Sequence, residues 1–158
     1  MKHSQPIGGS TLRVDSRQKV TGEARYAEDI APPGLLHAAT VRCPHHHARL
    51  LALNVEAAAR LPGVVRAITA ADIPGVNGFP EYSLDEPLLV PVGGTAPHLG
   101  APLAFVVAET REQAEAARRA VEAEWEALPH TFEADDALRP AALPIHPDGN
   151  LLNTFSVA

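Results

Sequence analysis

Residues 103–128 read LAFVVAETREQAEAARRAVEAEWEAL, and their pattern decides the class of the fold. The opening run LAFVVA is apolar at every position, which is typical of a strand that is covered on both faces. Thr110 then precedes Gln113 by three residues, the spacing of a capping box at the first turn of a helix. From Val121 onward apolar residues alternate with glutamates, which indicates a half-exposed strand. The stretch therefore predicts strand, helix, strand.

Working outward, apolar runs indicate three further strands, over residues 35–42, 49–53 and 64–69. Pro44 forces a break between the first two, which then form either a hairpin or two strands that cross between sheets. Asn54 can cap a short helix over residues 55–61. Thr69 and Asp72 have the capping-box spacing of a single helical turn. We expect one α/β (α+β) domain with a mixed sheet, a principal helix near residues 111–120 and short helices elsewhere.

Proline is frequent, with 15 among 158 residues, about twice the usual share of ~5%. Prolines and glycines crowd residues 74–100, which excludes a long helix or a central strand there and predicts a long loop. Loops of this length are uncommon and usually touch a ligand or a partner, or are disordered. We expect residues 1–133 to form the domain with an N-terminal arm. Residues 134–158 should form an extended linker or tail whose apolar residues need a partner surface.

Charge and composition exclude several classes of function. The formal net charge is −6, and no segment concentrates Lys and Arg, so we expect no nucleic-acid partner. The N-terminal residues hold no apolar run long enough for a signal peptide or a membrane helix, and we expect no membrane partner. A single cysteine cannot form an internal disulfide, which is compatible with the cytoplasm.

Three consecutive histidines, His45, His46 and His47, follow the only cysteine, Cys43, and raise the question of a metal site. In an extended chain His45 and His47 share one side while His46 faces away, so at most two of them can reach one ion. A Cys43 thiolate with one of these two is conceivable. Structural zinc sites usually need four ligands, and the other histidines are scattered singly. We therefore predict polar residues on a turn between strands, with adventitious nickel or zinc binding at most.

Other catalytic patterns are equally weak. The carboxylates of residues 81, 85 and 86 lie in the long loop, where solvated side chains are the commoner explanation. We considered the serines as nucleophiles, and none stands in a Gly-x-Ser-x-Gly turn. They are Ser10, Ser16, Ser83 and Ser156. The glycine pairs at 8–9 and 93–94 lack the lysine of a phosphate loop and predict turns. Asp135 and Asp136 predict a helix start. We predict no catalytic, cofactor-binding or metal-binding residue in this chain.

A series of short segments, in order and with matching spacing, carries more information than any one motif. Three of these segments are RCPHHHAR at 42–49, LPGVV at 61–65 and TAADIP at 69–74. The full series comprises residues 7–10, 13–15, 19–22, 24, 26–27, 29–30, 33–37, 42–49, 61–65, 69–74, 100–104 and 106–111. The series resembles the start of the large, molybdenum-binding subunit of the xanthine dehydrogenase and aldehyde oxidase family. Two residues depart from the family pattern: Cys43 stands where serine is usual, and Ala101 where glutamine is usual. The second departure removes a side-chain amide and any hydrogen bond that it would make to neighbouring domains.

The resemblance implies an α/β-hammerhead fold and makes the histidine stretch a Pro-His-x-His turn that is not a metal motif. In this family the molybdopterin cofactor and the catalytic glutamate belong to domains that follow the hammerhead. The chain would then be a fragment of the large subunit or a short subunit of a split enzyme, without catalysis of its own. The implied reaction is molybdenum-dependent hydroxylation of an aldehyde or N-heterocycle with water as the oxygen source.

The implied partners are the remaining molybdopterin-binding domains or subunit, together with iron-sulfur clusters and FAD on partner subunits or domains. The alternative function is a free-standing interaction or scaffold module without enzyme activity. A third hypothesis, a histidine-based metal carrier, predicts stoichiometric metal that survives mild chelation.

Overall fold

The computed structural model describes residues 12–79, 86–151 and 153–157, in two compact units, Met1–Leu35 and Leu36–Ala158. The first unit contains α1 (Ser16–Thr21) and the 3₁₀ turn η1 (Ala27–Asp29), neither of which has a buried residue. Gly22 ends α1 in the left-handed conformation, with φ of 76°. Within the described ranges, no helix has both the length and the apolar character needed to cross a membrane.

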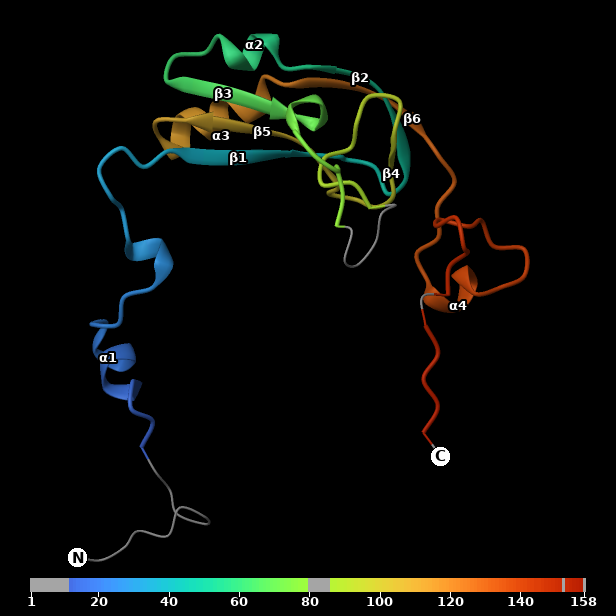
Figure 1. Ribbon diagram of the computed structural model, residues 1–158, viewed down its shortest axis with the longest axis horizontal. Coiled ribbons are helices and arrows are strands. Elements are labelled where there is room, and N and C mark those ends of the chain that lie inside the picture. The colour runs from blue at the N-terminus through green and yellow to red at the C-terminus, as the bar shows by residue number, and fades with distance from the viewer. Residues whose placement is uncertain (1–11, 80–85, 152, 158) are drawn as a thin grey trace, which may run out of the picture. The chain divides into compact units, whose positions relative to one another are not determined.

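In the second unit, three strands form one antiparallel sheet, which we call sheet 1 (Figure 1). Its order is β1 (His37–Arg42), β5 (Pro102–Ala108), β3 (Val64–Thr69). The central strand β5 has no exposed residue, in keeping with its uninterrupted apolar sequence.

Sheet 2 is also antiparallel, with the order β4 (Thr95–Ala96), β2 (Ala48–Asn54), β6 (Glu122–Ala127). Because β1 and β2 belong to different sheets, residues 43–47 carry the chain from one sheet to the other and do not form a hairpin. Along β6 the glutamates are exposed while Ala123 and Trp125 are half-buried, as the alternation predicted, whereas Ala127 at the end of the strand is exposed, contrary to that prediction.

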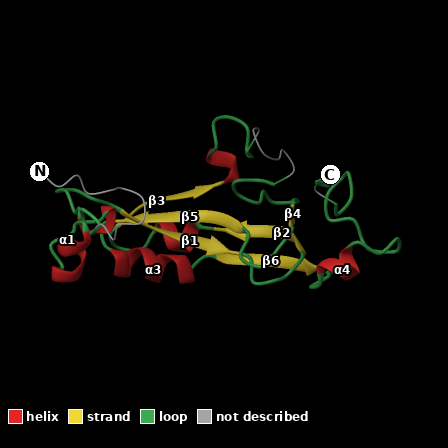
Figure 2. Cartoon of the chain, turned by 90° about the horizontal axis from the view of Figure 1, so that it is seen from below, coloured by secondary structure: helices red, strands yellow, loops and turns green. Residues whose placement is uncertain are grey.

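The principal helix α3 (Arg111–Arg119) begins where the capping box predicted. The Thr110 hydroxyl accepts the Gln113 N–H at 3.2 Å, and Gln113 Oε1 accepts the Thr110 N–H at 3.0 Å. Ala114 and Ala117 are buried, and the helix lies along β1 and β5, as Figure 2 shows. Small side chains on this face allow the close approach that a nine-residue helix needs in order to be stabilised by the sheet.

Short helices form near the predicted starts, but α2 is shorter than the predicted 55–61 and its N-cap position is Val55, not Asn54. Asn54 Oδ1 accepts the Glu56 N–H at 3.0 Å at the start of α2 (Glu56–Ala59). The 3₁₀ turn η2 (Ala70–Asp72) has its capping box in place, since one Asp72 carboxylate oxygen accepts both the N–H and the hydroxyl of Thr69. In α4 (Ala134–Ala137), Asp135 and Asp136 occupy the first turn.

The main core lies between the two sheets and α3 and consists of aliphatic side chains. Its largest fully buried members are Leu50, Leu103, Val90 and Val106, with Cys43 beside them. Among the described residues packed against this cluster, Trp125 is the one aromatic, at the partly buried margin. Because the sequence has few aromatic residues, small and branched side chains on short strands fill the core.

The fold class is confirmed, but the sheet differs from the single mixed sheet that we expected. All strand pairs described are antiparallel, and they divide into two sheets of three strands. The strands before and after α3 do not return to one sheet, because β5 pairs with β1 and β3 whereas β6 pairs with β2. Apolar periodicity identifies a strand without naming its partner, so this division was not visible in the sequence.

The proline-rich loop and the tail are more structured than we expected. Residues 86–101 include β4 and the buried residues Leu89 and Val90, so this half of the loop belongs to the core. In the tail, the Asn150 side-chain amide donates to Ala137 O at 3.0 Å and to Leu143 O at 2.9 Å, closing a loop after α4. Residues 153–157, by contrast, form neither helix nor strand.

Candidate functional site

The histidine turn, residues 43–47, is fixed to sheet 1 at its first residue. The Cys43 N–H donates to Ala101 O at 2.9 Å, and the Gly100 N–H donates to Cys43 O at 2.9 Å. Arg42 Nη1 also donates to Gly100 O, at 2.8 Å. The turn therefore starts on a rigid backbone bridge to the segment that precedes β5.

Each histidine of the turn has a different partner. The His45 ring meets Trp125 edge-on with centroids 5.8 Å apart, and His47 Nδ1 lies 2.6 Å from Pro129 O. Since that carbonyl only accepts, His47 Nδ1 carries the proton and donates. The alternation expected from the sequence, with His45 and His47 on one side and His46 on the other, is not observed, because residues 45–47 form bends and are not extended; His46 and His47 both face residues 129–132, whereas His45 faces Trp125.

His46 joins a small aromatic cluster with the chain that leaves β6. Its ring centroid lies 5.1 Å from that of His130 and 4.7 Å from that of Phe132, and the latter two rings are 4.8 Å apart. The turn thus holds residues 128–132 by ring contacts and by backbone, because the Leu128 N–H also donates to His47 O at 2.9 Å. This is a structural clamp on the segment after β6.

Cys43 is buried and its thiol is held by the next residues. The His45 N–H donates to Cys43 Sγ at 3.4 Å, and Sγ in turn lies 3.4 Å from His45 O. Burial raises the pKa of the Cys43 thiol, an effect that the hydrogen bond at His45 only partly offsets. A thiol kept protonated in this way is a poor nucleophile and a poor metal ligand.

Among the described residues, no group of three or more His, Cys, Asp or Glu side chains could hold a metal ion. Glu86 lies 3.6 Å from His98 in a partly exposed pair, while Glu81, Asp85, Ser83, Ser10 and the glycine pair at 8–9 lie outside the described residues. Ser16 donates to Arg13 O, and Ser156 is exposed in the tail.

The glycine pair at 93–94 forms a turn, as predicted. Gly93 adopts φ of 85°, its N–H donates to Leu50 O at 2.7 Å, and the Leu50 N–H donates to Gly94 O at 2.9 Å. These bonds bring the loop alongside β2 just before β4 begins.

A cavity of about 440 Å³ lies between this loop and sheet 1. Most of its lining is apolar, and the polar side chains along it are Thr40, Arg42, Glu86 and His98. Asn77, which no sequence pattern indicated, fixes the backbone of Leu89, one of the lining residues. Its side-chain amide donates to Leu89 O at 2.7 Å and its Oδ1 accepts the Leu89 N–H at 3.0 Å. A single asparagine in a proline-rich loop belongs to no periodic pattern that could predict these hydrogen bonds to Leu89.

Comparison with known proteins identifies what this arrangement belongs to. The family model described as "Aldehyde oxidase and xanthine dehydrogenase, a/b hammerhead domain" matches residues 21–129. The chain belongs to this hammerhead family. The match covers both sheets, α3, the histidine turn and the loop with its cavity.

Relatives and solved structures agree with that assignment. The chain is 37% identical over 155 residues to the xanthine dehydrogenase molybdenum-binding subunit of Escherichia coli, covering 93% of this chain and 21% of that protein. It is 33% identical over 150 residues to the nicotinate dehydrogenase large molybdopterin subunit of Eubacterium barkeri, covering 95% of this chain and 35% of that protein. The aldehyde oxidoreductase from Desulfovibrio gigas superposes with a TM-score of 0.75 at 31% identity, over 85% of this chain and 16% of that one. The hammerhead chain therefore spans a minor part of the proteins that it matches.

The two positions where the resemblance leads us to expect serine and glutamine, Cys43 and Ala101, both lie at the backbone bridge of the histidine turn. Cys43 and Ala101 are joined by the hydrogen bond described above, and both side chains are buried in the main core. Ala101 is 1% exposed, so a longer amide at this position would have to point into the adjoining cavity, which Ala101 lines.

Proposed function

We propose that this chain supplies the hammerhead part of a molybdenum hydroxylase of the xanthine dehydrogenase and aldehyde oxidase type, with a structural role and without catalysis of its own. The observation that carries the proposal is the family match over residues 21–129, joined to relatives named for molybdenum-binding subunits. The rest of the large subunit would be supplied by the same polypeptide or by a second one.

The lining of the cavity between the proline-rich loop and sheet 1 does not favour an anionic cofactor. This cavity is mostly apolar, its Glu86 and His98 pair with each other, and its Arg42 donates to a backbone carbonyl. An anionic cofactor needs several converging donors, and the described lining does not offer them. The molybdopterin group, which would supply the hydroxylation chemistry with water as the oxygen source, is therefore assigned to the part of the enzyme outside this chain.

Substrate selection is likewise assigned elsewhere. The relatives are named for xanthine, nicotinate and aldehyde chemistry, yet their identity to this chain stays between 31% and 37%. Similar identity to enzymes named for different substrates supports a proposal in which substrate selection lies outside this domain. Within the proposal the substrate class is an aldehyde or an N-heterocycle, and electrons leave through iron-sulfur clusters.

The proposed partners are the molybdopterin-binding remainder and the subunits or domains that carry iron-sulfur clusters or FAD. We place the assembly in the cytoplasm, which suits a chain with one cysteine.

The test is affinity purification of the chain at its endogenous level from its own host, with mass spectrometry and elemental analysis for molybdenum, iron and zinc on the same sample. We expect molybdenum and iron to arrive with larger subunits. A matched purification after deletion of residues 36–128 from the tagged chain controls for proteins that bind the tag. Recovery of the chain alone and without metal would contradict the proposal and favour a scaffold module, whereas stoichiometric zinc on the isolated chain would favour a metal carrier.

A further inference from the structure

The cavity lies on the face of sheet 1 that α3 does not cover. Its floor is one row of cross-strand neighbours, since Phe105 of β5 stands opposite Thr40 of β1 on one side and Ile68 of β3 on the other. Ala39, the neighbour of Thr40, packs with Ala114 of α3, and successive residues of a strand point to opposite faces. The loop supplies the walls: Ile73, Phe79, Leu88, Leu89 and Pro97.

The cavity is shaped in advance by hydrogen bonds of the loop. Asn77 holds both backbone groups of Leu89, and the next residue, Val90, donates its N–H to Pro102 O at 2.8 Å. Leu89 and Val90 are buried, so this wall is anchored in the domain. A preformed pocket loses little conformational entropy when it is filled, which favours tight contact.

The chemistry of the lining fits apolar protein side chains better than a small polar molecule. Small-ligand sites orient their ligand with a few polar groups aimed into an apolar pocket. Here the Arg42 guanidinium is engaged with Gly100 O, and Glu86 pairs with His98 at the rim. The same loop also exposes the large apolar side chains of Val76 and Leu99, which do not line the cavity.

We propose that this cavity receives apolar side chains from the remainder of the molybdenum-binding subunit, and thereby forms the main contact between the hammerhead and the rest of the enzyme. The proposal rests on the proposed function above. We choose this occupant because the chain spans only 21% and 35% of the length of two large relatives. Most of such a subunit therefore lies outside the chain. The fully buried centre of a protein interface is more apolar than the rest of the surface, which is the character of this cavity.

The test compares two variants of the tagged full chain in the purification described above. Phe79→Asp puts a charge on the wall, at a residue that is 49% exposed, and Thr40→Phe fills the floor with a ring. Leu51→Asp is the matched control, because Leu51 is also 49% exposed but lies on β2 in the other sheet. Circular dichroism melts of the three purified variants establish that each is folded.

We expect Phe79→Asp and Thr40→Phe to lower recovery of the molybdenum-containing partner at least ~tenfold, as the loss of a central interface contact does, and Leu51→Asp to leave recovery unchanged. If the wild type and both cavity variants recover that partner equally, the cavity proposal is wrong while the proposed function stands. If the wild type recovers no such partner, the proposed function itself fails. A dimer of the chain that Thr40→Phe dissociates, or a small molecule in native mass spectra that it displaces, would also overturn the proposal.

Discussion

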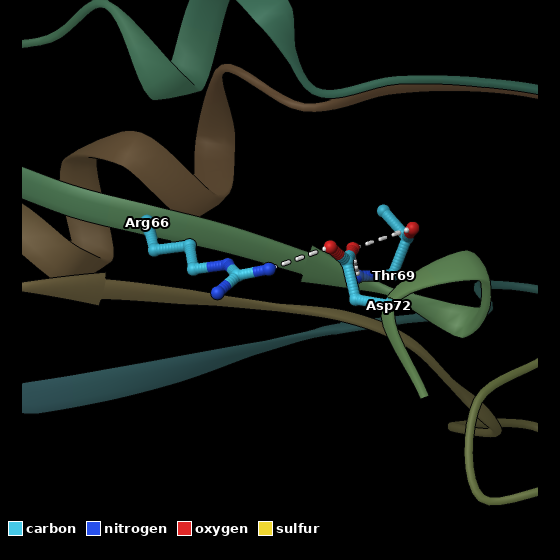
Figure 3. A network of polar contacts seen from close by, with 3 residues as sticks. All are labelled: Arg66, Thr69 and Asp72. Carbon is cyan, nitrogen blue, oxygen red and sulfur yellow. Dashed lines mark hydrogen bonds and ion pairs between the residues drawn. The ribbon is translucent and has the colours of Figure 1, made fainter. Parts of the chain in front are cut away.

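Asp72 shows how much local structure one carboxylate can organise. Its two oxygens accept the Thr69 N–H at 2.8 Å, the Thr69 hydroxyl at 3.0 Å and an N–H of Arg66 at 2.9 Å (Figure 3). The Thr69 N–H, with the Arg66 guanidinium and the Thr69 hydroxyl, holds the pKa of this carboxyl below its ordinary value of 3.8. The ionised form is therefore favoured in the folded chain, and it joins the end of β3 to η2.

This pKa shift predicts a loss of stability in acid. Because the folded pKa is the lower one, the contribution of Asp72 is present above pH ~4 and disappears as the pH falls through the folded pKa. We expect the urea midpoint of the wild type to fall more between pH 5 and pH 3 than that of Asp72→Asn. Asp135→Asn, an exposed position in α4, serves as control and should follow the wild type. If the urea midpoints of the wild type and of Asp72→Asn fell equally between pH 5 and pH 3, this role of Asp72 would be refuted.

At the scale of elements, the start of α3 depends on a glycine in another element. Gly63, just before β3, has φ of 77°, and a Cβ there would overlap the Gln113 side chain. That same side chain closes the capping box on Thr110. In addition, the Glu109 N–H donates to Gly63 O at 2.9 Å. The turn before β3 and the first turn of α3 thus form one packed unit.

We therefore predict that Gly63→Ala and Gln113→Ala are not additive. Gly63→Ala should cost ~2 kcal/mol, roughly half from the left-handed backbone and half from displacing Gln113, whereas Gln113→Ala alone should cost ~1 kcal/mol. The double variant should lose about 1 kcal/mol less stability than the sum of the two single variants, because the Gln113 side chain that Gly63→Ala displaces is already absent. Urea denaturation of the four chains measures the cycle. Gly100→Ala, at φ of 86° in open space, isolates the backbone cost. Strict additivity would show that the two residues are independent.

The clamp of the histidine turn makes a second prediction at this scale. His47 Nδ1 donates to Pro129 O at 2.6 Å, next to the bond from the Leu128 N–H to His47 O. We expect His47→Ala to open the end of β6 and to speed hydrogen exchange at the Leu128 amide about fivefold, the equivalent of one hydrogen bond of ~1 kcal/mol. His46→Ala, whose ring contacts lie further along the chain, should leave Leu128 protected. Equal effects of the two variants would mean that the rings, and not the hydrogen bond, hold this segment.

Across the whole molecule, the elements followed from the sequence more closely than their arrangement did. Local rules placed β5, the Thr110 cap and β6 correctly, because each depends on neighbours within four residues. They could not assign β5 and β6 to different sheets, since pairing is decided by contacts far apart in the chain. The cavity was missed for the same reason, because Asn77 acts on Leu89 across the loop. The residue types and their spacing indicated no active site in the sequence. The family was indicated instead by the ordered series of short segments that resemble it.

The distribution of buried residues predicts which part of the chain holds the fold. Every buried apolar residue described lies between Ala39 and Ala117, and β6 is the last strand among the described residues. We expect a chain of residues 36–133 to melt within ~3 °C of the full chain and to keep its urea m-value, because the removed segments expose little additional surface on unfolding.

A matched shorter chain, residues 36–121, lacks β6 and should not fold, since β2 would lose its partner and the core would lose Trp125. If instead the 36–133 chain melted more than ~10 °C below the full chain, residues 12–35 or 134–157 would have to contribute to the fold itself. Their exposed apolar side chains, among them Leu12, Val14, Phe155 and Val157, would then be needed within this chain and not only at a partner surface.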